Sequence, residues 1–436
     1  MGKRGFRAAI LHCLADPAVA GDAAWEYFAD GLLVVADGKV VAVGDYTDLM
    51  SSKSASNSIA ACAVVDYRDK LIVPGFIDTH IHYPQTDMIG AYGAQLLDWL
   101  ESYTFPEEAK FADESHARDV AERFLNELMR NGTTTALVFG TVHPQSVDAF
   151  FQAAQQRQLR MIAGKVLMDR NAPENLRDTA EQGYTESKAQ IQRWHGKDRL
   201  LYAVTPRFAP TSSREQLDKA GELLQEFPDV YLHTHLAENE AEIAWVAELF
   251  PESENYLDVY EHSGLLGQRS VFAHGVHLCD SSCERLAATN SVVAHCPTSN
   301  LFLGSGLFPL RRLQQHGVRV GLGTDVGAGT SFSMLQTMGE AYKVQQLQGE
   351  SLPALEALYL ATLGGAKALS LDHCIGNFKA GKEADFVVLD LAATPLLASR
   401  TAQCRTIQET LFVLNTLADD RAVAATYILG EQAQFN

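Results

Sequence analysis

The stretch Val73-Pro-Gly-Phe-Ile-Asp-Thr-His-Ile-His82 decides the fold class of this chain. Pro74-Gly75 marks the start of an apolar run, and Phe76-Ile77 favour a strand over a helix. Side chains in a strand repeat every two residues, so His80 and His82 point the same way and can hold one metal ion together. A helix would separate them by about 200° around its axis. The stretch therefore predicts a strand that ends in a metal-binding pair.

Seven further segments of this kind follow, separated by helical patterns such as Glu114–Arg130, Glu215–Phe227 and Leu307–His316. Eight βα units over about 290 residues are typical of a (β/α)8 barrel. A doubly wound open sheet is the α/β alternative, but no GxGxxG follows a strand, so dinucleotide binding has no support. The eight predicted strands are Gly75–His82, Thr133–Gly140, Arg160–Leu167, Leu200–Phe208, Val230–Ala237, Ser270–Leu278, Ser291–Thr298 and Val318–Val326.

Both ends of the chain are rich in β-branched residues. Near the N-terminus, Asp37-Gly38 joins two apolar runs in the manner of a hairpin. Near the C-terminus, Gly381–Asp390 and Val423–Gly430 are strand-like. Neither end is long enough for a core of its own. We therefore expect residues 1–70 and 366–436 to form one small β-sandwich beside a barrel at residues 71–365, with a loop in the serine-rich stretch 51–58.

Composition narrows the class of partner. The net charge of −19 argues against nucleic acid and anionic membranes. No apolar stretch approaches the ~20 residues that span a bilayer, and the N-terminus lacks the pattern of a signal peptide. The seven cysteines are odd in number and include no CxxC pair, which indicates reduced thiols and a cytoplasmic protein.

Histidines and acidic residues gather at the predicted C-terminal ends of the strands, where barrels of this class carry their chemistry. Imidazole and carboxylate together suit Zn2+ or Fe2+, with a position left open for water. His233, His277 and His295 lie at the same ends, but we expect each to be a hydrogen-bonded core histidine. The candidate functional residues at these ends are His80, His82, His235, Glu238, His274 and Asp325.

The motifs PGFIDTHIH, HTHLAE, HG, HCPTSN and GLGTD, in this order, resemble the amidohydrolase superfamily, and specifically its mononuclear deaminase and chlorohydrolase branch. Members are metal-bearing (β/α)8 barrels with a β-sandwich built from both chain ends. Dinuclear members carry a modified lysine at the end of strand four, where this chain has Val204-Thr-Pro-Arg207, and Lys165 is interpreted as structural. The resemblance thus implies one metal per chain, either Zn2+ or Fe2+, held by His80, His82, His235 and Asp325.

Four segments, which overlap these motifs or lie between them, resemble more specifically those members of the branch that act on guanine. They are His82–Gln85, Leu96–Glu107, Thr205–Phe208 and His235–Glu238. The resemblance spans the whole chain and implies hydrolysis of guanine to xanthine and ammonia, in purine catabolism, by a homodimer. The alternative within the class is another aromatic heterocycle, such as 8-oxoguanine, cytosine or a triazine. A non-catalytic scaffold is disfavoured because all four implied ligands are present.

Hydrolytic deamination assigns a role to each candidate. A bound divalent metal lowers the pKa of water from about 16 to about 7, and Asp325 can accept the proton that the water loses. Glu238 lies three residues beyond His235, where it can protonate a ring nitrogen and then the leaving amine. The alternative for Glu238 is to cap the following helix. His274 can polarise the attacked carbon or orient the hydroxide, and its alternative is a hydrogen-bonded core histidine.

Recognition of a purine requires groups that match its edge. Guanine presents O6 and N7 as acceptors, and Arg207 offers a forked donor for such pairs. Gln85 offers both a donor and an acceptor, while Phe208 and Trp99 can stack on the ring. We expect His82, His235 and Glu238 to contact the substrate as well. The alternative for Arg207 is a salt bridge to an acidic residue, and for Trp99 a place in a helix core.

Overall fold

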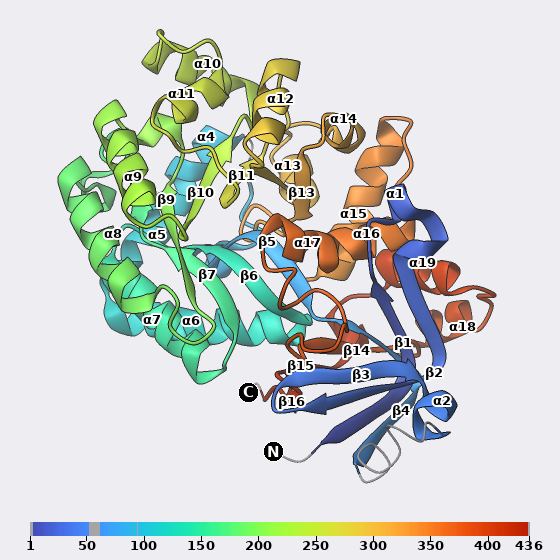
Figure 1. Cartoon of the computed structure of the whole chain (residues 1–436). Coiled ribbons are helices and arrows are strands. Elements are labelled where there is room, and N and C mark those ends of the chain that lie inside the picture. Colours follow the sequence, from blue (N-terminus) through green and yellow to red (C-terminus); the bar gives the residue numbers. More distant parts are fainter. Residues whose placement is uncertain (1–2, 52–61, 94, 435–436) are drawn as a thin grey trace.

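The structure is a computed structural model that describes residues 3–51, 62–93 and 95–434. The predicted loop at residues 51–58 lies outside these ranges except for Ser51. Two sheets organise the chain, a barrel of parallel strands and a seven-stranded mixed sheet beside it (Figure 1). The predicted fold class is therefore confirmed.

The barrel strands fall within the eight predicted segments. They are β5 (Phe76–His82), β6 (Thr133–Phe139), β7 (Arg160–Gly164), β8 (Val166–Leu167), β9 (Leu201–Pro206), β10 (Tyr231–Leu236), β11 (Ser270–His274), β12 (Val292–His295) and β13 (Arg319–Leu322). Neighbouring strands are parallel and follow chain order, and β8 pairs with β9. The barrel closes between β13 and β5, where the hydroxyl of Thr79 donates to the carbonyl of Leu322 at 2.9 Å.

Three of the strands, β11, β12 and β13, end three or more residues earlier than the sequence pattern predicts. β11 ends at His274, whose φ is +73°, and β13 ends at Leu322, three residues before Asp325, whose φ is +52°. After β12, Pro297 starts a helix instead of continuing the strand. A non-glycine residue in left-handed backbone is strained and is often found at functional sites. The chain thus leaves extended geometry at two of the residues predicted to carry chemistry.

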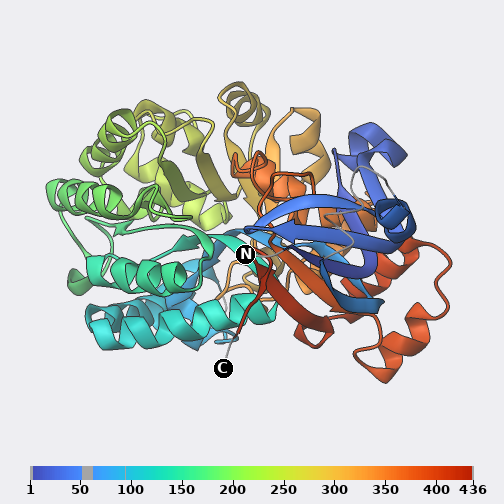
Figure 2. The ribbon, with the colours of Figure 1, turned by 60° about the horizontal axis from the view of Figure 1, so that its bottom comes forward.

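Helices surround the barrel on the outside (Figures 1 and 2). The predicted helix at Glu114–Arg130 has the same bounds in the structure, because Asp113 caps its N-terminus and its apolar residues face the core. The helix predicted at Leu307–His316 begins only after Pro309. The helices are α4 (Leu96–Trp99), α5 (Phe105–Ala109), α6 (Glu114–Arg130), α7 (Pro144–Gln156), α8 (Ala180–Trp194), α9 (Arg214–Glu226), α10 (Glu240–Leu249), α11 (Tyr256–His262), α12 (Asp280–Ala288), α13 (Pro297–Phe302), α14 (Leu310–Gln315), α15 (Met334–Leu347), α16 (Ala354–Ala361) and α17 (Leu363–Ala368).

The second sheet combines the two ends of the chain, as predicted. Its strands are β1 (Arg4–Cys13), β2 (Trp25–Ala36), β3 (Lys39–Asp45), β4 (Ala63–Pro74), β14 (Phe386–Asp390), β15 (Val423–Ile428) and β16 (Glu431–Gln432). β4 pairs in parallel with β1 and antiparallel with β14, so the N-terminal strands meet the C-terminal strands at the β4–β14 pair (Figure 2). Asp37-Gly38 forms the predicted hairpin between β2 and β3. The sheet bends around its own core, because Val40 exchanges backbone hydrogen bonds with Gly381 and Lys382.

The two sheets are joined directly. β4 extends through Pro74, and only Gly75 separates it from the barrel strand β5. After β14 the chain adds α18 (Pro395–Thr401) and α19 (Ile407–Leu417), and Leu411 and Leu414 pack into the barrel's outer core. The domain limits 1–70, 71–365 and 366–436 remain a prediction. Every helix in the described ranges is too short or too polar to cross a membrane.

Candidate active site

Three histidines and one aspartate converge at the C-terminal mouth of the barrel. Nε2 of His82 lies 3.3 Å from Nε2 of His80 and 3.3 Å from Nε2 of His235. Oδ1 of Asp325 lies 3.1 Å from Nε2 of His80 and 3.3 Å from Nε2 of His82. Tetrahedral coordination with Zn–N bonds of 2.0–2.1 Å places neighbouring donor atoms about 3.3 Å apart. The spacing of this donor set therefore fits a divalent metal ion.

A hydrogen bond on the far side of the His235 ring turns its free lone pair inward. Nδ1 of His235 lies 2.7 Å from the carbonyl oxygen of Arg207, which can only accept, so this nitrogen carries the ring proton. Burial lowers the pKa of His82 to about 3 and that of His235 well below its ordinary value, so both rings are neutral. Nε2 of His235 is then an unprotonated donor aimed at the cluster, as metal ligation requires.

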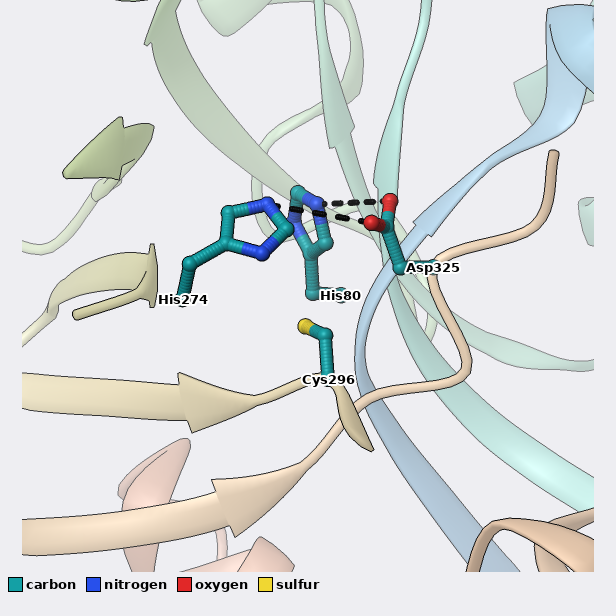
Figure 3. A group of neighbouring side chains, drawn as sticks. All are labelled: His80, His274, Cys296 and Asp325. Atoms are coloured by element: carbon teal, nitrogen blue, oxygen red, sulfur yellow. Dashed lines mark ion pairs between the residues drawn. The ribbon is translucent and has the colours of Figure 1, made fainter. Parts of the chain in front are cut away.

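Asp325 faces the buried histidines His80 and His274 (Figure 3). Burial alone would raise its pKa, but the contacts with His80 and His82 lower the pKa well below the ordinary range. Ser299 donates a hydrogen bond to Oδ2 at 2.5 Å. The backbone before Asp325 passes close to His80 at Gly323. A Cβ at Gly323 would lie 2.9 Å from Cβ of His80, so this position requires glycine.

Cys296 lies beside the same group and was not predicted as a site residue (Figure 3). Its sulfur and the ligand atoms of His80, His274 and Asp325 all lie within 4.8 Å of one another. Burial raises the pKa of the Cys296 thiol well above its ordinary value, so it stays protonated. Because the thiolate is the form that ligates metal, the histidine and aspartate set remains the better donor set.

Glu238 and His274 face each other across the mouth. Oε2 of Glu238 lies 3.4 Å from Nε2 of His274, and Ser305 donates a hydrogen bond to Oε1 at 3.2 Å. Burial raises the pKa of Glu238 to about 8, and the Asp325 carboxylate adds to the shift. Asn300 contacts Nδ1 of His274 at 2.8 Å and fixes the ring. At neutral pH Glu238 is thus a protonated acid inside the cavity.

The side chain of Glu238 does not cap the helix that follows it, which was the alternative role. α10 is capped by Asn239 and by Glu242, which accepts hydrogen bonds from the N–H groups of Glu238 and Asn239 at 3.0 and 3.2 Å. Tyr256 donates to the other oxygen of Glu242 at 2.6 Å. The carboxyl group of Glu238 is therefore free to face the cavity.

Arg207 and Gln85 lie together on another wall of the cavity. Nη1 of Arg207 donates to both oxygens of Glu108 at 2.9 and 2.8 Å, so the salt bridge considered as an alternative does form. Gln85 donates to Glu108 at 3.2 Å and accepts from the N–H of Gly327 at 3.1 Å. Within the described residues, Nη2 and Nε of Arg207 keep no hydrogen-bond partner. One edge of the guanidinium is thus engaged and the other is free.

These side chains line one partly open pocket, whose empty space, including the part open to solvent, is about 390 Å³. Apart from His80, which lies deeper, every predicted site residue contributes to its wall. Leu96, Leu100, Leu303 and Ala328 complete it, and nothing in the sequence distinguishes them from core residues. The predicted residues that line the cavity are His82, Gln85, Trp99, Arg207, Phe208, His235, Glu238, His274 and Asp325.

His233 contributes more than the core packing expected of it. It is fully buried, and its Nε2 lies 2.7 Å from Nδ1 of His80, where it orients that ring. The spacing His233-Thr-His235 repeats that of His80 and His82, and this signal could have placed His233 at the site. By contrast, His295 stacks on Phe308, with ring centroids 4.2 Å apart, and Lys165 forms a buried ion pair with Asp178.

The fold and this cluster agree with the comparisons to known proteins. Residues 71–433 match the amidohydrolase family, and the chain belongs to that family. It is 57% identical over 407 residues to the guanine deaminase of Escherichia coli (strain K12). The aligned residues make up 93% of this chain and 92% of that protein.

Solved structures give the same result. The structure of E. coli guanine deaminase matches all of both chains with a TM-score of 0.95 and 52% identity. The structure of guanine deaminase from C. acetobutylicum with bound guanine in the active site has a TM-score of 0.89 and 29% identity, over 99% of this chain and 100% of that one.

Proposed function

We propose that this protein is a guanine deaminase, which hydrolyses guanine to xanthine and ammonia. One observation carries the proposal: the metal-type cluster, the protonated Glu238 and the free edge of Arg207 all face a single pocket. A nucleophile, an acid and a purine-edge donor are the three requirements of this reaction. The relatives named guanine deaminase support the same substrate.

We propose that His80, His82, His235 and Asp325 hold one Zn2+ per chain, with Fe2+ as the alternative that this donor set also suits. A bound divalent ion supplies hydroxide at neutral pH, because it lowers the pKa of water to about 7. Asp325, whose pKa is low, is ionised and accepts the proton of the attacking water. His274 is fixed by Asn300 and orients the nucleophile toward C2 of the ring.

Glu238 supplies the proton that the ring needs. In the proposed sequence, it protonates the ring nitrogen next to C2 as the water oxygen bonds to that carbon. Loss of the amine then breaks the C2–N2 bond, and the proton taken by Asp325 leaves with ammonia. The C2 hydroxyl returns its proton to Glu238 as it becomes the carbonyl of xanthine. The balance is guanine plus water to xanthine plus ammonia, without an oxidant or reductant.

Arg207 and Gln85 hold the opposite edge of the purine in this proposal. The free nitrogens of Arg207 suit the acceptors O6 and N7, and Gln85 retains one N–H for the same edge. Phe208 and Trp99 lie against the faces of the purine ring in this proposal. The two residues are buried, with 4% and 3% of their surfaces exposed. This anchoring leaves C2 toward Glu238 and the cluster.

We further propose that the protein acts in purine catabolism in the cytoplasm, as a homodimer. All seven cysteines are free, which is compatible with a reducing compartment. The net charge of −19 supports a small-molecule substrate over nucleic acid or an anionic membrane.

Ammonia release tests the proposed function directly. The purified protein is given guanine, 8-oxoguanine, cytosine and a triazine, and the metal content of the same sample is determined. We expect the largest kcat/KM with guanine and about one Zn2+ per chain. A higher kcat/KM with any of the other three rings would contradict the assignment of guanine.

The Arg207→Ala variant is expected to lose kcat/KM for guanine by about 10- to 150-fold. A hydrogen bond to a charged donor contributes roughly 1.5–3 kcal/mol, and each 1.36 kcal/mol is about tenfold in rate. The loss should be smaller for 2-aminopurine, which lacks O6 and never makes this contact. Steady-state kinetics with both substrates measure the difference.

The salt bridge to Glu108 calls for a control, because Arg207→Ala leaves a buried carboxylate unpaired. Arg207→Lys keeps a positive charge near Glu108 but lacks the fork. It should retain the wild-type melting temperature more closely and still show the larger loss with guanine. Equal losses with both substrates would mean that Arg207 only supports the pocket wall.

A further inference from the structure

Glu108 is a buried carboxylate that touches the site without lining the cavity. It is 0% exposed and lies in α5, and the preceding residues Leu96, Trp99 and Leu100 cover the cavity. Among the residues that the structure describes, its carboxylate accepts hydrogen bonds from Arg207, after β9, and from Gln85, after β5. A buried carboxylate is costly unless its charge and hydrogen bonds are matched, and these two partners match it.

The geometry fixes two side chains at once. Both oxygens of Glu108 accept from Nη1 of Arg207, and Oε1 also accepts from Nε2 of Gln85. The Gln85 amide is held at its other end by Gly327, so it cannot flip without losing both bonds. Arg207 lies with its Cζ 5.6 Å from the centroid of Phe105, which belongs to the same helix as Glu108. A single residue thus sets the donor pattern on this wall.

We propose that Glu108 is a positioning residue that makes the enzyme selective for purines with a carbonyl at C6. It does so by holding Arg207 and Gln85 in the orientation that reads that edge. This inference rests on the proposed function. It predicts that loss of Glu108 impairs recognition of O6 rather than the chemistry at C2.

The Glu108→Gln variant tests the inference through a ratio. We expect kcat/KM for guanine to fall by about tenfold while kcat/KM for 2-aminopurine falls much less, with metal content unchanged. The matched control is Glu107→Gln, in the same turn of α5, where the carboxylate pairs with Lys110 at 2.6 Å instead. The control should keep the wild-type ratio between the two substrates.

A thermodynamic cycle separates positioning from general support. In the Gln85→Ala/Arg207→Ala background, adding Glu108→Gln should change the guanine rate by no more than about twofold, because its partners are already gone. If Glu108→Gln does not fold, Glu108→Asp keeps the charge, shifts the carboxylate by one methylene and should move the ratio in the same direction.

The outcomes are distinct. Unchanged kcat/KM for both substrates in a folded Glu108 variant, while the wild type deaminates guanine, overturns this inference and leaves the proposed function standing. An equal loss with both substrates also overturns it, because general support of the pocket would produce that result. A wild type that releases no ammonia from guanine overturns both.

Discussion

Replacing His82 with alanine is expected to remove the bound metal and with it all measurable turnover. Nε2 of His82 lies 3.3 Å from nitrogens of both His80 and His235, so its loss opens the donor set at its centre. Without the ion, the pKa of water stays near its bulk value of about 16 instead of about 7. The nucleophile at neutral pH then disappears, and the rate should fall by many orders of magnitude.

Elemental analysis and ammonia release, made on the same preparation, measure this effect. His262→Ala is a suitable control, because this histidine is about half exposed at the end of α11, where it lies near Asp258 instead of the cluster. The control should keep about one metal per chain. Full metal occupancy in His82→Ala, or activity that survives prolonged chelation, would contradict the assigned ligands, and two equivalents in the wild type would contradict a single-metal site.

The Glu238→Gln variant should keep its metal and its melting temperature but lose turnover by about 10²- to 10⁴-fold, the usual contribution of a positioned proton donor. Glutamine has the same shape and can still accept from Ser305, so packing is preserved. Because the pKa of Glu238 is raised to about 8, the wild-type rate should also fall as pH rises through this value and the proton is lost. The kcat of the variant and the pH profile of the wild type are the measurements.

Glu242→Gln provides the comparison for this variant. Glu242 is also buried, with its pKa raised to about 7, but its oxygens cap α10 and accept from Tyr256. Its amide variant should lower the melting temperature with turnover closer to wild type. If Glu238→Gln stays within about threefold of the wild-type kcat, Glu238 is not the proton donor.

The gathering of the candidate site residues at the strand ends could be predicted, because it follows from the periodicity of side chains in strands and from the direction of the barrel strands. His80 and His82 lie on one face of β5 because side chains in a strand repeat every two residues. His235, His274 and Asp325 follow from the rule that parallel strands of a barrel end on one side. The predicted strands at β11, β12 and β13 were too long. Left-handed backbone at His274 and Asp325, and Pro297 after β12, turn the chain away from extended geometry, and the hydrophobic pattern does not indicate these positions.

Glu108 could not be predicted for a different reason. It follows Glu107 in a helix of only five residues, and the two have the same chemistry. Which of them faces inward depends on Arg207 and Gln85, which are 99 and 23 residues away along the chain. Pairing of this kind is decided by tertiary packing, so local pattern cannot identify it. Leu96, Leu100 and Leu303 in the apolar wall of the pocket could not be predicted either, because their sequence pattern is the same as that of a leucine in the hydrophobic core.

The direct passage from β4 into β5 has a consequence for how the protein is made. β4 is flanked by β1, from the start of the chain, and by β14, which arrives some 300 residues later. Until residues 386–390 have left the ribosome, the strand that leads straight into His80 and His82 keeps one open edge. Open strand edges recruit other chains, and pairings between distant segments form slowly. β4 therefore gains its second neighbour only near the end of synthesis, which leaves its junction with the histidine-bearing strand exposed to misassembly on the ribosome.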